Sequence, residues 1–240
     1  MVIEISKLQH IVWLVFLVLL STSVQAELSF DLPLGQSDSR TLNVQRKVDE
    51  IFERGEYDRA YFIYRNELVP VGDKYAQYMI GFMHLTGMGA NEDPVVASAW
   101  YRLAAERGTP QFVAVRDMLM SDITEDERRR SDQLFLEIRR KYSDLAILLS
   151  LIKRSVQSVD SRTGSRLKAT GSPMTVIDAR SPNQSQSSAV YYDRIESELQ
   201  AHLVMLSEIG DFPNLETDLA RFDLDEVEHL VNQRLETLED

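Results

Sequence analysis

The sequence predicts an all-α fold, namely a short α-solenoid of helix-turn-helix hairpins followed by a C-terminal helical pair. Residues 76–108 hold two apolar runs of helical period on either side of a Gly-Met-Gly turn. Similar patterns recur 34 and 37 residues away, a period typical of repeats built from helical pairs. Two further apolar stripes of helical spacing follow residue 190.

The first helix expected in this central unit carries small residues on one face. Ala76, Ile80 and Gly81 are four and five positions apart, so they share that face. A glycine inside a helix costs about 1 kcal/mol relative to alanine, so Gly81 indicates that another backbone approaches closely. Gly87 and Gly89 follow the last apolar residues, where the end of a helix requires a positive φ.

The second helix of the unit is expected to begin after Asp93, because aspartate is a good N-cap and the following proline fits the first helical position. Gly108 is expected to end the unit. Small residues keep this helix thin, and two aromatic residues fill the space between hairpins; in order they are Ala97, Trp100, Tyr101, Ala104 and Ala105.

This spacing resembles the Sel1-like repeat, a relative of the tetratricopeptide repeat. The chain departs from the family's pattern at Ile80, His84, Ala90 and Val96, and His84 stands where the family has tyrosine. The resemblance covers one clear unit and implies an α-solenoid that binds other proteins, often in complexes that assemble or regulate membrane machinery. The positions that match the pattern are Ala76, Gly81, Gly87, Gly89, Asp93, Ala97, Trp100, Tyr101, Ala104, Ala105 and Gly108.

Weaker copies flank the central unit. Ala60 lies 37 residues before Ala97, and Phe112 lies 34 residues after Tyr78. We therefore expect three hairpins over about residues 43–142, the third of which lacks the glycine turn and suits a capping repeat. Within that third hairpin, Thr124 and Glu127 have the spacing of a capping box.

Composition divides the rest of the chain. The expected segments are a signal peptide or signal anchor (1–26), an N-terminal linker (27–42), the repeat domain (43–156), a polar flexible linker (157–189) and an acidic C-terminal helical hairpin (190–240). An alternative for the polar segment is that short strands at 166–169 and 174–177 order against a partner, adding a strand to its sheet.

The N-terminal segment indicates the compartment. An unbroken apolar run, Ile11–Leu20, precedes Val24-Gln25-Ala26, which has the small-x-small form of a cleavage site. The run is shorter than the roughly 20 residues of a spanning helix, so we expect export to the periplasm. An uncleaved inner-membrane anchor is the alternative, and a buried core helix is a third. The chain has no cysteine, which fits a bacterial envelope protein and excludes disulfides and thiolate chemistry.

Charge is unevenly distributed. Residues 191–240 hold fourteen acidic and three basic residues, whereas residues 139–180 hold nine basic and three acidic ones. These regions are either solvated surfaces that attract each other weakly, or the basic one binds an anionic membrane face or protein. The net charge of −12 argues against a nucleic-acid partner.

The sequence gives no support to catalysis. None of its four histidines has a second ligand at metal-binding spacing, and neither a nucleophile elbow nor a phosphate-binding loop occurs. We therefore predict a non-enzymatic protein with no catalytic residue, no cofactor and no metal site. An enzyme acting on cell-wall glycans is a further hypothesis, which no constellation of residues supports.

The predicted function is that of an exported scaffold or adaptor whose protein partners the sequence does not identify. Tyr75, Tyr78 and Phe82 are the candidate partner-binding residues, because first helices of hairpins form the concave surface of a solenoid. The alternative is a membrane-tethered structural protein with an uncleaved N-terminal anchor.

Overall fold

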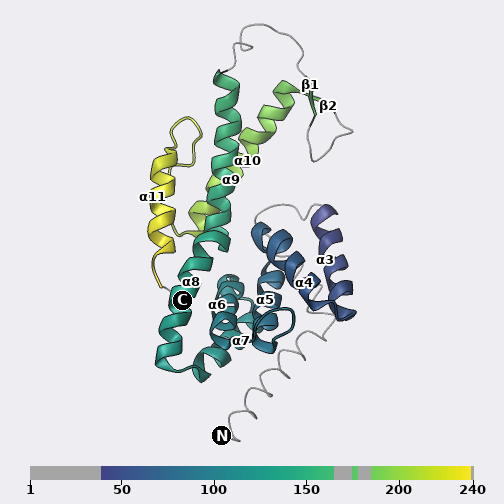
Figure 1. Ribbon diagram of the computed structural model, residues 1–240. Helices are drawn as coiled ribbons and strands as arrows, with labels where there is room; N and C mark the ends of the chain where they lie inside the picture. Colours follow the sequence, from purple (N-terminus) through teal and green to yellow (C-terminus); the bar gives the residue numbers. More distant parts are fainter. Residues whose placement is uncertain (1–38, 165–174, 178–184, 239–240) are drawn as a thin grey trace, which may run out of the picture. The chain divides into compact units, whose positions relative to one another are not determined.

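The computed structural model describes residues 39–164, 175–177 and 185–238 (Figure 1). Of these, the residues up to Ile147 and those from Leu235 onward form one compact unit, and Leu148–Arg234 form the other. The predicted signal segment and most of the predicted N-terminal linker lie outside the described residues. The all-α class is confirmed, since helices account for most of the described chain.

The first unit is built from helices joined by short turns. α3 packs against α4, α5 lies beside α6, and α6 contacts both α7 and α8 (Figure 1). A π-helix, η1 (Tyr64–Leu68), and a 3₁₀ turn, η2 (Val69–Val71), follow α4, and a second 3₁₀ turn, η3 (Ala105–Arg107), follows α6. The helices are α3 (Ser39–Glu53), α4 (Tyr57–Ile63), α5 (Lys74–Thr86), α6 (Pro94–Ala104), α7 (Pro110–Asp122) and α8 (Glu125–Tyr142).

Two glycines explain how closely these helices approach one another. Gly89 has φ +73°, and a Cβ there would lie 2.5 Å from the carbonyl oxygen of Tyr57 and 2.9 Å from Met83 Cε. A Cβ at Gly81 would lie 3.2 Å from the ring of Tyr101. The predicted close approach at Gly81 is therefore made by an aromatic ring rather than by another backbone.

Side-chain caps fix where the helices begin. Asp93 accepts hydrogen bonds from the backbone N–H groups of Val95 (3.0 Å) and Val96 (3.1 Å), which confirms it as the N-cap of α6. Thr124 and Glu127 form the predicted capping box at the start of α8. Each of these bonds satisfies a backbone donor that the first turn of a helix leaves without a partner.

The core of the first unit is aromatic and follows the predicted repeat positions. Tyr78 stacks on Phe112, with ring centroids 4.8 Å apart, and meets Tyr101 edge-on at 5.1 Å. Aromatic pairs of this geometry add about 0.5–1.5 kcal/mol beyond the area they bury. The apolar repeat positions, each at most 4% exposed, are Ala76, Ile80, Ala97, Trp100, Tyr101, Ala104 and Ala105.

The second unit differs from the predicted linker. α9 (Asp144–Gly164) continues past the predicted boundary at residue 156, because no glycine or proline interrupts it before Gly164. β1 (Thr175–Ile177) pairs antiparallel with β2 (Ser185–Ser187). The strand expected at 174–177 is thus present, whereas the one expected at 166–169 lies outside the described residues.

Two C-terminal helices, α10 (Ser188–Ile209) and α11 (Leu224–Leu235), match the two predicted apolar stripes. Lys153 Nζ of α9 lies 2.6 Å from Glu228 Oε1 of α11. The stripes supply apolar core rather than an exposed face; their buried members are Ile195, Leu199, Leu203, Leu206, Val227, Val231 and Leu235.

Replacement of Gly89 by alanine should destabilise the first unit by roughly 3 kcal/mol or more, because a backbone clash adds to the 1–2 kcal/mol of a positive φ. Gly108→Ala is the matched control: φ is +71°, but the added Cβ meets no atom within 4 Å, so about 1 kcal/mol should be lost. Urea unfolding of residues 27–240 measures both through the fluorescence of Trp100, the one tryptophan in that segment. Equal losses in the two variants would contradict the packing assigned to Gly89.

Candidate functional site

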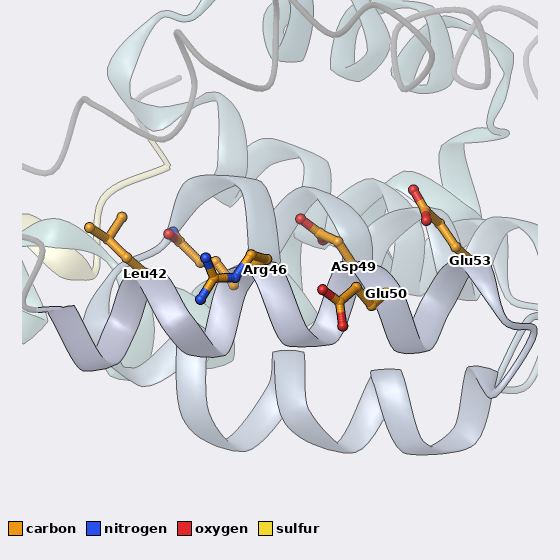
Figure 2. Close-up of a pocket in the computed structure, with 6 residues that line it drawn as sticks. Leu42, Arg46, Asp49, Glu50 and Glu53 are labelled. Carbon is orange, nitrogen blue, oxygen red and sulfur yellow. The ribbon is translucent and has the colours of Figure 1, made fainter.

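An open depression of about 370 Å³ runs along α3 in the first unit (Figure 2). Its residues recur every three or four positions, so one side of a single helix supplies them. Three carboxylates and one guanidinium make the depression acidic. The lining residues are Leu42, Gln45, Arg46, Asp49, Glu50 and Glu53.

The amphipathic sequence of α3 positions this depression. Val48 and Ile51 are almost completely buried in the core of the unit. Asp49 follows Val48 directly and is therefore drawn partly into the protein, whereas Glu50 and Glu53 remain exposed. The helix thus presents one buried and two solvated carboxylates along the same face.

The buried carboxylate is held by a tyrosine. The hydroxyl of Tyr64 donates a hydrogen bond of 2.8 Å to Asp49 Oδ1. Burial raises the pKa of Asp49 from its ordinary 3.8 to about 6, with the charges of Asp73 and Glu53 adding to it and the Tyr64 bond opposing it. Burial also raises the pKa of Tyr64 well above its usual range, so this hydroxyl acts as a neutral donor.

A π-helical segment aims Tyr64 at this carboxylate. In η1 the N–H of Val69 bonds to the carbonyl of Tyr64, five residues earlier. In the same turn, the guanidinium of Arg65 contacts two neighbouring aromatic rings, 5.0 Å from the centroid of Trp100 and 4.7 Å from that of Tyr142. Single π-helical turns are frequent at functional sites.

A second buried carboxylate lies behind the depression. Gln45 Nε2 donates to Asp73 Oδ2, and Asp73 Oδ1 accepts from the N–H of Ala76 as the N-cap of α5. Burial raises the pKa of Asp73, although these bonds and the charge of Arg107 oppose the rise. The Gln45–Asp73 bond links the depression directly to the start of α5.

The junctions between successive helical pairs are joined by buried ion pairs, which we call the junction network. Lys74 Nζ lies 2.6 Å from Glu106 Oε2 and 3.2 Å from Asp144 Oδ1. Arg107 donates two bonds, of 2.7 and 2.8 Å, to the same Asp144 carboxylate. Burial pushes the pKa of Asp144 upward, but Lys74 and Arg107 outweigh it and hold the pKa below its ordinary value.

The three predicted partner contacts lie in different environments. Tyr78 and Phe82 are at most 2% exposed, so neither can contact a partner and that part of the prediction is corrected. Most residues of their helix are buried, the polar Lys74 and Gln77 among them, so the helix is enclosed on nearly every side. Tyr75 is half-buried, with its ring 6.5 Å from that of Tyr64, and so lies near the depression.

His84 is well accommodated between the helices. Its Nε2 lies 3.1 Å from the hydroxyl of Tyr61, and its Nδ1 lies 3.1 Å from the carbonyl oxygen of Asn91. Burial lowers the pKa of His84, which favours the neutral ring that fits these two partners. Both ring nitrogens of His84 therefore have a polar partner.

The sequence analysis missed the buried charges altogether. One signal was available for those at the start of α5: Gly72 lies 36 residues before Gly108, and both have a left-handed backbone conformation. An alignment of these two glycines would have placed Asp73 and Lys74 directly after the end of a helical pair, at the junction with the next pair. Nothing in the local pattern marks Asp49, since its partner Tyr64 is 15 residues away.

Comparisons with known proteins leave the family open. No protein-family model, curated protein or solved structure matches the chain. Within the described residues, no group of three or more histidine, aspartate or glutamate side chains is arranged to hold a metal ion. Among the described helices, none has both the length and the apolar character needed to span a bilayer.

Replacement of Lys74 by methionine should destabilise the first unit by about 3–5 kcal/mol, because it leaves buried carboxylates without their cation. Arg54→Met provides the control: its pair with Glu56 is exposed, and loss of such a pair changes stability by less than about 1 kcal/mol. Urea unfolding at pH 7.5 compares the two variants. Similar small losses would show that the junction network contributes little.

Tyr78→Phe and Tyr101→Phe should each leave stability unchanged or raise it by about 1 kcal/mol, since both buried hydroxyls lack a hydrogen-bond partner among the described residues. Tyr64→Phe should instead cost about 1–3 kcal/mol at neutral pH, because Asp49 loses its donor. The same unfolding assay distinguishes them. A large loss at Tyr78 or Tyr101 would indicate that their hydroxyls have a partner in solution.

Proposed function

We propose that this protein is an exported, non-enzymatic scaffold or adaptor that binds other proteins in the bacterial envelope through a short solenoid of Sel1-like helical repeats. The segment up to residue 26 directs export in this proposal, and an uncleaved inner-membrane anchor is the alternative for the same segment.

One observation carries the proposal: several side chains that join different helical pairs lie about one repeat apart in the sequence. Ser98 bonds to Ser131, 33 residues away, and Lys74 bonds to Glu106, 32 residues away. Arg107 and Asp144 are separated by 37 residues. Contacts at this separation are typical of solenoids, whose usual task is to present an extended surface to other proteins. Lys74 also reaches Asp144, 70 residues away, so contacts at twice this separation occur as well.

The depression on α3 is the proposed partner contact. It combines the exposed carboxylates of Glu50 and Glu53 with Leu42, whose surface is 45% exposed. Phe62 on α4, which packs against α3, is 63% exposed and adds an apolar side chain to the surface of this pair. Tyr75 remains in the proposal as a neighbour of this surface, whereas Tyr78 and Phe82 do not.

Affinity capture from crosslinked envelope extract tests this proposal. The bait is residues 27–240, because a bait ending at residue 142 would remove Asp144 from the junction network. Reversing the charge of α3 with Glu50→Lys and Glu53→Lys should lower recovery of the captured protein at least tenfold, since a rim charge of the wrong sign repels its partner.

The matched control carries Glu208→Lys and Glu226→Lys, two exposed carboxylates of the second unit. Recovery by this control should equal that of the unaltered bait. Equal losses in both double variants would remove α3 as the contact, and a bait that recovers no protein would contradict the scaffold function. Fractionation of cells that carry the full chain tests whether the N-terminal segment is an anchor. Protein that only detergent releases from the membrane favours the tethered form.

A further inference from the structure

Asp49 lies where α3 packs against the rest of the first unit, and its surroundings are unusual for a carboxylate. It is half-buried, and it makes no ion pair with any described residue. Its hydrogen bond comes from Tyr64 of η1, which packs against α3. The junction network differs in this respect, because Asp144 there faces two cations.

The groups that surround Asp49 are mostly acidic. On its own helix, Glu50 and Glu53 line the same depression, and Arg46 is the one cation among the lining residues. From the start of α5, Asp73 faces the cluster through its bond to Gln45. From η1 the titratable neighbour is Tyr64, which stays neutral.

The charge of Arg107 acts on Asp73, but no cation among the described residues pairs with Asp49. Tyr75 of α5 has its ring against Tyr64. On α4, which also packs against α3, Asp58 and Arg59 are exposed, and Arg59 pairs with Glu56 at 3.0 Å. One added proton therefore removes a buried negative charge beside two other carboxylates.

We propose that α3 is a proton-controlled element of the first unit, held more tightly against η1 and α5 when Asp49 is protonated and released more readily when it is charged. This regulation goes beyond the scaffold function and holds whatever the partner is. The sign follows from linkage: an acid whose pKa is higher in the folded state than in the unfolded state stabilises folding at low pH, and this stabilisation disappears as pH rises through the folded value. With 3.8 for the exposed group and about 6 for the folded one, the loss falls between these two values.

Hydrogen exchange of the full chain, measured by mass spectrometry, tests the proposal. The protection factor at each pH is the intrinsic exchange rate at that pH divided by the measured rate. The protection of α3 should be roughly tenfold greater at pH 5 than at pH 7.5, as the two pKa values require. Peptides from α6, which the cluster does not touch, provide the internal reference for an intact fold.

Asp49→Asn keeps an acceptor for Tyr64 but cannot be charged, so protection of α3 should be high at both pH values and differ less than threefold. Glu50→Gln, one position along the same helix and exposed, should keep the tenfold difference. Tyr64→Phe removes the bond that favours the charged form, so the midpoint should move above pH 6. Protection of α3 that does not depend on pH in the unaltered chain, or a pH dependence that Asp49→Asn retains, would overturn the proposal.

Discussion

The first unit depends above all on the buried charges where one helical pair gives way to the next. Burying an ion costs several kcal/mol even after relaxation, and attraction offsets this only when every partner is present. Lys74 meets this condition, since Nζ lies within 3.2 Å of Glu106, Asp144 and the side-chain oxygen of Gln77. Because each partner comes from a different segment, the charges fix how successive junctions align.

Asp49 shows the opposite arrangement in the same unit. Its carboxylate is buried with a tyrosine donor and acidic neighbours, and no described cation pairs with it. Charge therefore acts differently in two parts of the first unit at neutral pH. The ion pairs of Asp144 hold the junctions in place, whereas the charge of Asp49 opposes the packing of α3. Regions of low local stability are the ones from which binding and regulatory elements are drawn.

Features set by the local backbone could be predicted from the sequence, and features set by distant partners could not. Gly89 and Asp93 were predictable because a positive φ and an N-cap each restrict residue type within a few positions. The end of α9 was placed too early because polar composition was taken to indicate a linker, although residues 157–163 contain no helix breaker.

The candidate site was the hardest part to predict, for a physical reason. Tyr78 and Phe82 have the spacing of a surface stripe, yet most residues of α5 are buried, so a helical pattern alone cannot separate a concave face from a core. The character of the depression on α3 depends on which carboxylate of this helix is partly buried. The Tyr64–Asp49 and Gln45–Asp73 hydrogen bonds determine this, and they join residues 15 and 28 positions apart.

The buried carboxylate also decides between two interpretations of α3. A helix with one exposed face needs polar side chains on that face, and Glu50 and Glu53 supply them on α3. Asp49 is only half-exposed, and because burial raises its pKa, its charge at neutral pH opposes the packing of the helix that carries it. A neutral residue of similar size would pack there without this cost. The combination of an unfavourable carboxylate, a π-helical turn and an open depression is the arrangement from which the proton-controlled release of α3 is inferred.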